Sequence, residues 1–367
     1  MAIERGLGAG GPADMPMIPE EEVLQNVIEM PAQPGVTELD DGSAIIGEYE
    51  DETEAPIDVP FDGNLAEVVD EGVLGQISSN LIGSIDDDLS AREEWEDTYK
   101  KGLEFLGMKT EERSEPFEGS SGVVHPLLAE SVTQFQAQAY RELLPSTGPV
   151  RTSVLGAQNE ALVKQSERVK DYMNYMITYE MEEYDPELDQ MLFYLPVIGS
   201  TFKKVYYDPL KGRAVSKFIH AEDLIVPYGA TDLISSPRVT HRISMDSNEV
   251  RKLQLTGFYR DIDLPSDSGE SSNDEVEESI DDIQGVHPSG PSEELTLYEV
   301  HTSLDIEGFE DVGQDGEPTG LRLPYIVTIV ADSGDVLSVR RNYTEMDPMK
   351  RAKQYFVHYK FLPGLGF

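Results

Sequence analysis

The hydrophobic and polar positions along the chain divide it into a helical half and a strand-rich half. Between residues 85 and 200, apolar residues recur at spacings of three and four, which predicts amphipathic helices. Ser90 and Glu93 form a capping-box pattern at the first start, and Gly199 is suited to end the last helix. The expected helices begin, in chain order, at Ser90, Pro126, Leu162 and Asp185.

After Gly199 the apolar residues alternate with polar ones, which predicts strands. The expected strands cover, in chain order, residues 202–207, 215–219, 238–244, 295–304, 323–331, 336–341 and 355–361, with a short helix at 247–255. Turn residues at 208–212 and 333–335 predict two tight hairpins. The predicted fold class is therefore α+β, a helical region followed by an antiparallel β-rich region.

The formal net charge of −43 is concentrated in two segments. Residues 1–90 hold 22 Asp and Glu against one basic residue, Arg5, and residues 261–294 hold 12 acidic residues and no Lys or Arg. Segments this acidic and this poor in sustained apolar patterns do not bury enough surface to offset the entropy of ordering. We therefore predict a disordered acidic tail over 1–84, a helical region at 85–200 and a β-rich region at 201–361, which a surface insertion at 261–294 interrupts.

The chain lacks the sequence motifs of several classes of function. Cysteine is absent, which excludes disulfides, thiolate-bound metals and a cysteine nucleophile. The six histidines are scattered without metal-ligand spacing, and no phosphate-binding loop of the G-x-x-x-x-G-K type is present. The amino terminus lacks the basic and apolar regions of a signal peptide, which favours an intracellular protein. We expect no catalytic residue, no metal site and no cofactor.

A cluster of basic residues on one predicted hairpin is the exception in this acidic chain. Its members are Lys203, Lys204, Lys211, Arg213 and Lys217. One interpretation is a charged edge strand that resists aggregation. The other is a contact with DNA or with an acidic neighbouring protein.

Three segments of the chain resemble the portal proteins of short-tailed, double-stranded-DNA bacteriophages. They are Phe117–Pro126, which leads into the second helix, Gly199–Pro209, and the closing Tyr355–Phe367. The resemblance rests on the order of these three segments and on the arrangement of helices followed by strands. It spans about residues 85–367.

The resemblance implies a non-enzymatic homo-oligomeric ring, usually of twelve copies, at one capsid vertex. Double-stranded DNA passes through such a ring during packaging and ejection, and the terminase motor, capsid proteins and tail proteins bind to it. The resemblance also implies a wing-like β-rich region, assembly in the host cytoplasm and a final location in the virion. It implies that the sequence is an N-terminal fragment in which residues 362–367 begin a missing stem.

Two other hypotheses stay open from the residues alone. The acidic surplus is compatible with an acidic interaction protein that mimics DNA, or with a hydrolase that depends on carboxylates.

A net-acidic ring is also consistent with a conduit, because a surface that neutralised many phosphates would bind DNA and slow its passage.

Overall fold

The computed structural model describes nine stretches of the chain. They are residues 36–38, 44–46, 59–106, 117, 126–157, 159–209, 211–264, 294–313 and 317–362. They belong to two units. The first, up to Ile57, contains two short antiparallel strands, β1 (Val36–Glu38) and β2 (Ala44–Ile46), and the second runs from Asp58 to the end of the chain.

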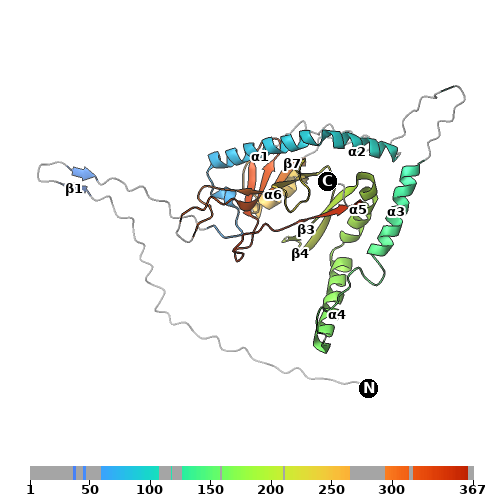
Figure 1. The fold of residues 1–367 in the computed structure, drawn as a ribbon. Helices are drawn as coiled ribbons and strands as arrows, with labels where there is room; N and C mark the ends of the chain where they lie inside the picture. The colour runs from blue at the N-terminus through green and yellow to red at the C-terminus, as the bar shows by residue number, and fades with distance from the viewer. Residues whose placement is uncertain are drawn as a thin grey trace, which may run out of the picture. The chain divides into compact units, whose positions relative to one another are not determined.

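The second unit combines helices with antiparallel sheets, which confirms the α+β fold class (Figure 1). Its helical elements are η1 (Leu65–Glu67), α1 (Glu71–Ala91), α2 (Glu93–Phe105), α3 (Leu127–Leu143), α4 (Glu160–Tyr175), the π-helical turn η2 (Met176–Glu180), α5 (Tyr184–Ile198) and α6 (Ser247–Leu255). None of the helices in the described stretches has the length and apolar character needed to cross a membrane.

The strands form two antiparallel sheets. They are β3 (Ser200–Asp208), β4 (Arg213–Ile219), β5 (Leu224–Ile225), β6 (Arg238–Asp246), β7 (Glu294–Leu304), β8 (Leu323–Val330), β9 (Val336–Arg341) and β10 (Phe356–Lys360). The smaller sheet has the order β10-β3-β4 and the larger one the order β5-β6-β7-β8-β9. Every strand predicted after Gly199 is present, and the two-residue strand β5 was not predicted.

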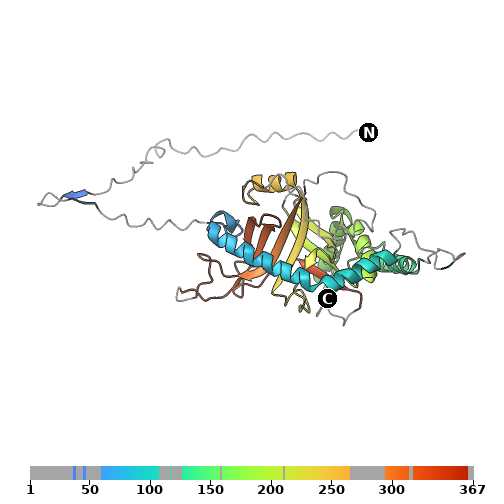
Figure 2. The same ribbon diagram turned by 90° about the horizontal axis from the view of Figure 1, so that it is seen from above.

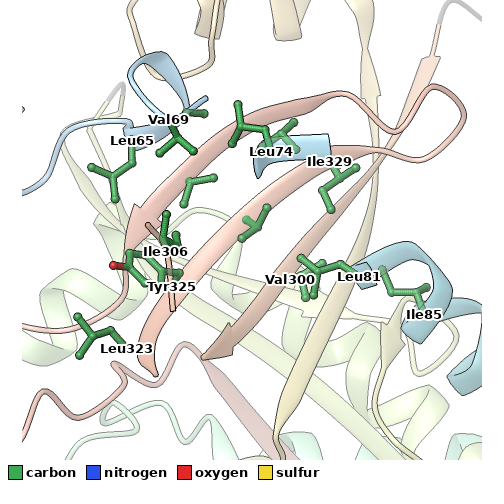
Figure 3. Packing of buried hydrophobic residues seen from close by; sticks show 14 of the residues in the cluster. Leu65, Val69, Leu74, Leu81, Ile85, Val300, Ile306, Leu323, Tyr325 and Ile329 are labelled. Carbon is green, nitrogen blue, oxygen red and sulfur yellow. The ribbon is translucent and has the colours of Figure 1, made fainter. Parts of the chain in front are cut away.

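Helix α1 runs across the larger sheet and closes its core (Figures 2 and 3). Leu74, Leu81 and Ile85 point from the helix toward sheet residues such as Val300 and Ile329, and all five side chains are buried. The prediction of a disordered tail up to residue 84 was therefore wrong for residues 59–84. Residues 59–84 bury their apolar side chains against the sheet, whose strands lie far away in the sequence.

The capping box predicted at Ser90 and Glu93 does not form. Helix α1 continues through Ser90 to Ala91, and α2 begins at Glu93 after a break at Arg92 with no side-chain cap. Arg92 instead holds the junction, because its guanidinium pairs with Glu96 at 2.6 Å and donates to the carbonyl oxygen of Glu222 at 2.8 Å. The helix expected to begin at Ser90 therefore begins at Glu93, because Ser90 belongs to the end of α1.

A second core lies between the helices and the smaller sheet. It is built around Leu188, Met191 and Leu192 of α5, with residues of α2, α3 and β4, namely Tyr99, Leu103, Val132 and Phe218. Gly199 ends α5 in the left-handed conformation with φ of 87°, as predicted, and turns the chain directly into β3.

Two carboxylates at the start of α5 cover one edge of the smaller sheet. At the edge strand β4, the amides of Ser216 and Phe218 donate to the carboxylates of Glu183 and Glu187 at 3.4 and 2.6 Å. These two carboxylates lie one helical turn apart at the start of α5. They satisfy edge amides that would otherwise face solvent or another strand.

The predicted acidic insertion at 261–294 lies between α6 and β7. Residues 261–264 continue from α6, and β7 begins at Glu294. Residues 265–293 are outside the described residues, as are most of residues 1–58. The expectations for those stretches therefore stay predictions.

Candidate subunit interface

The five basic residues predicted as a contact surface do not share one surface. Strands β3 and β4 pair in register as expected, with Lys204 opposite Lys217. Only Lys211 and Lys217 are exposed. Lys203, Lys204 and Arg213 are drawn into the protein, because helix α5 packs against one side of the hairpin and β6 and β7 lie close to the other.

Lys203 is a buried cation with an exposed fraction of 2%. Its ammonium lies 4.4 Å from the centre of the Tyr184 ring, and among the described residues its Nζ has no hydrogen-bond partner. Burial lowers the pKa of Lys203 to about 8, against the opposing effect of Glu187 and Glu183. This residue cannot contact DNA or a neighbour, and the prediction that it does was wrong.

Lys204 joins the two sheets through a partly buried ion pair. Its ammonium donates to both carboxylate oxygens of Glu299 on β7, at 2.6 and 2.7 Å. Glu299 also lies 2.7 Å from Nε2 of His301, and Lys204 lies 3.4 Å from Nδ1 of His241. Burial alone would raise the pKa of Glu299, but Lys204 and His301 lower it below its usual range. The ammonium of Lys204 is therefore held inside the fold by these contacts.

Arg213 is held in the same way by α5. Its guanidinium pairs with Glu183 at 2.8 Å, and the hydrogen bond to Glu183 raises the pKa of Arg213. The basic contact surface predicted from the sequence is thus reduced to Lys211 and Lys217. The alternation of residues in a strand predicts the face of the sheet on which a residue lies. It does not predict whether other elements cover both faces.

The segments that carry the family resemblance meet in space. The second and third segments supply β3 and β10, which pair in register from Ser200 opposite Lys360 to Lys204 opposite Phe356. The first leads into α3, where Phe135 lies 5.2 Å from the ring of Phe361. Residues 118–125 of that first segment are outside the described residues.

Helix α3 is in turn fixed to α5 by polar contacts. The hydroxyl of Tyr140 donates to Asp185 at 2.5 Å, and this hydrogen bond raises the pKa of Tyr140 to about 12. Gln136 donates to Asp189 at 2.9 Å. The three segments and their helices therefore form one packed module.

Helix α4 projects away from this module (Figure 1). None of the residues of α4 or η2, all of which the structure describes, is buried. One side of α4 is held by the preceding segment, where Asn174 accepts from the amide of Val150 at 2.9 Å and Thr152 donates to the carbonyl oxygen of Ser166 at 3.0 Å. Gly148 has φ of 93°, and a Cβ there would lie 2.5 Å from the Asn174 amide oxygen. These contacts therefore fix α4 to the preceding residues 148–152.

Large apolar side chains are exposed on α4 and η2. They are Leu162, Val163, Val169, Tyr172, Met173, Tyr175 and, in η2, Tyr179. The exposed fractions of Tyr172 and Tyr179 reach 60% and 74%. A helix of this length without a covered apolar face gains little stability from tertiary packing. We define Leu162, Val169, Tyr172 and Met173 as the α4 stripe.

Sequence reasoning found the α4 stripe as a helical pattern but not as an exposed one. The periodicity of Leu162, Val169 and Tyr172 is the same for a helix that faces its own core and for one that faces another molecule. The partners that would distinguish the two cases lie on distant elements.

Comparisons with known proteins give no family for this chain. Neither a scan against protein-family models nor a search of curated proteins found a match. Within the described stretches, no group of three or more histidine and carboxylate side chains is arranged to hold a metal ion.

Proposed function

We propose that this chain is a structural subunit of a portal ring at a bacteriophage capsid vertex. In this role it serves as a conduit for double-stranded DNA and as an attachment point for the packaging motor and the tail. The β-rich region of residues 201–361 corresponds to the wing of such a subunit. The ring belongs to the virion and is assembled in the host cytoplasm.

The observation that carries the proposal is the uncovered amphipathic helix α4. A 16-residue helix with no buried residue and a row of exposed apolar side chains is an incomplete packing unit in a single copy. Neighbouring copies in a closed ring would complete it. The packed module formed by the segments that resemble portal proteins supports the same function.

The electrostatics are compatible with a conduit. Of the five basic residues on the β3–β4 hairpin, only Lys211 and Lys217 remain exposed. Two exposed cations in a chain of net charge −43 neutralise few phosphates, so this hairpin would not hold passing DNA tightly.

The test is the mass of the purified full-length protein as a function of concentration, with electron microscopy of the particles. We expect closed rings of a single rotational symmetry. A protein that stays monomeric at every concentration and salt condition contradicts the proposed function, and so does an open fibre.

A further inference from the structure

Helix α4 and the residues before it form an arm that ends in an exposed leucine. The chain runs back along the helix from Val150, which is bonded to Asn174, and turns into α4 at Asn159. Leu155 lies near this far end and is 93% exposed, more than any other exposed large apolar side chain of the described residues. The 16 residues of α4 make the arm about 24 Å long.

A cavity of about 450 Å³ lies where four distant segments of the chain meet. They are the loop before η1, the tip of the β3–β4 hairpin, the end of α6 and the edge strand β9. The apolar part of its wall consists of Pro60, Pro209, Leu253 and Phe258. Its volume is within the range of binding sites, about 300 to 1,000 Å³. The cavity therefore has room for an apolar side chain and part of its surroundings.

The lining of the cavity also carries one positive and one negative charge. The guanidinium of Arg340 lies 4.2 Å from the ring of Phe258 and donates to the carbonyl oxygens of Asp62 and Phe258 at 2.8 Å each. Within the described stretches, no carboxylate forms an ion pair with this guanidinium. Asp62, another residue of the lining, is exposed. A partner that offers one carboxylate and one amine would match both charges.

The far end of the arm offers such a pair of charges. Glu160 is the first residue of α4 and pairs with Lys164 at 2.6 Å, and the two side chains are 83% and 64% exposed. In Figures 1 and 2, α4 lies at the opposite end of the folded unit from η1, and the loop before η1 borders the cavity. One copy therefore cannot place its own arm in its own cavity. A contact between two different surfaces of identical copies is head-to-tail, and it closes into a ring when its rotation closes.

We propose that the arm of one copy inserts Leu155 into this cavity of a second copy. The leucine packs against the apolar part of the wall, and Glu160 faces Arg340. Lys164 faces Asp62. The occupant is a second copy because this chain itself supplies both the exposed apolar side chain and the pair of charges that match the cavity, on an arm that does not reach its own cavity. This inference rests on the proposed function, for which it names the contact between subunits.

The first experiment changes each side of the contact separately. Leu155→Asp places a charge on the arm, and Thr256→Trp fills the cavity, because Thr256 is an exposed residue of its lining. Tyr228→Asp is the matched control, because Tyr228 is 80% exposed and lies outside both surfaces. Association is measured by analytical ultracentrifugation, and circular dichroism verifies that each variant is folded.

We expect Leu155→Asp and Thr256→Trp each to weaken association about tenfold or more, because both changes prevent the same side chain from entering the same pocket. The control is expected to associate within about twofold of the original chain, because a change at an exposed residue away from the contact has a small effect.

A further variant tests the charges. Glu160→Lys combined with Lys164→Glu keeps the net charge and the pairing within α4 but exchanges the two positions. Like charges then face Arg340 and Asp62. We expect association to weaken about threefold or more at low salt, and the difference from the original chain to shrink at high salt. An unchanged association at low salt contradicts the proposed facing of the charges.

Single cysteines test the contact directly, because the chain has none of its own. A tagged chain with Leu155→Cys is mixed with an untagged chain with Thr256→Cys, and the disulfide between the two chains is followed under mild oxidation. In the control mixture, Tyr228→Cys takes the place of Thr256→Cys. A link that forms faster in the first mixture supports the proposal. Equal rates in the two mixtures, or a predominance of links between two Leu155→Cys chains, overturn it.

Three results distinguish this contact from the proposed function. If the chain forms rings that neither Leu155→Asp nor Thr256→Trp weakens, the contact is wrong and the proposed function stands. If only one of the two changes weakens association, the arm or the cavity has a different partner, and the contact is again wrong. If the original chain is monomeric throughout, both proposals are wrong.

Discussion

Asn64 and Val339 are joined across 275 residues of sequence by a buried hydrogen bond. The amide of Val339 donates to the side-chain oxygen of Asn64 at 2.9 Å, while the side-chain nitrogen of Asn64 donates to the carbonyl oxygen of Leu337 at 3.0 Å. The Asn64 oxygen also caps η1 by accepting from the amide of Ala66 at 3.1 Å. One amide side chain thus takes the place of a neighbouring strand at the edge strand β9.

Replacing Asn64 with alanine is expected to destabilise the fold by about 2 to 3 kcal/mol, because the buried amide of Val339 loses its acceptor. The carbonyl oxygen of Leu337 keeps a second donor, the amide of Arg260 at 2.8 Å. Urea unfolding measures the loss of stability, and hydrogen exchange at Val339 measures its location. Unchanged exchange at that amide would show that the edge is protected by something else.

Replacing Lys203 with methionine is expected to stabilise the fold by about 1 to 3 kcal/mol at pH 7, because a buried cation without a hydrogen-bond acceptor is removed. The pKa of Lys203 is lowered from 10.5 to about 8, so the unfolded chain holds a proton that the folded chain releases between these values. The original chain should therefore gain stability as the pH rises from about 8 to 10.5.

The matched variant is Lys217→Met, which changes an exposed lysine on the same hairpin. It should alter stability by less than about 0.5 kcal/mol at any pH. A stabilisation by Lys203→Met that does not shrink above pH 10 would contradict the link to the buried charge.

Replacing Glu299 with glutamine is expected to destabilise the fold by about 2 kcal/mol, because Lys204 is left in a partly buried site without its counter-ion. The double variant Lys204→Met with Glu299→Gln should lose less than the sum of the two single losses, which a double-mutant cycle measures by urea unfolding. Additive losses would mean that the two side chains do not depend on each other.

The same cluster predicts loss of stability in acid. Burial, and then the charge of Lys204, lower the pKa of His241 from 6.5 to about 3. As the pH falls through this interval, the unfolded chain takes up a proton that the folded chain excludes, so stability falls. The pKa of Glu299 is also lowered, which adds a loss below about pH 4.5. The variant His241→Phe should show a flatter decline in unfolding free energy between pH 6.5 and 4.5.

Binding of the folded chain to duplex DNA should be weak and only slightly dependent on salt if it occurs through the β3–β4 hairpin. With Lys211 and Lys217 as the exposed cations there, the slope of log affinity against log salt should not exceed about 2. Fluorescence anisotropy with the variant Lys211→Ala, Lys217→Ala measures the contribution of the hairpin. A slope of 5 or more would mean that other cations contact the DNA and would contradict this prediction.

Local patterns were enough to predict most elements of the second unit. The helix at 247–255 and the strand at 336–341 have the bounds that were predicted, and α5 ends at Gly199. In these places the apolar period, the turn residues and the final fold agree.

Helix α1 was missed because its local signals conflict with its final environment. Gly72, Gly75 and Gly83 lower its helix propensity, and the core-facing row includes Ser78 and Asp88. Asp88 is tolerated there because Arg238 of β6 pairs with it at 2.7 and 2.8 Å. No property of residues 71–91 alone reveals that partner. The burial of Lys203 and the exposure of the α4 stripe were missed for the same reason.

The carboxylates of Glu183 and Glu187 have a further consequence for the proposed ring. A strand from another molecule that approached β4 would have to displace both carboxylates from the amides of Ser216 and Phe218 before it could extend the sheet. In a ring of many copies, this edge of the smaller sheet would therefore be closed to strand exchange between neighbours, and the copies would have to join through other surfaces.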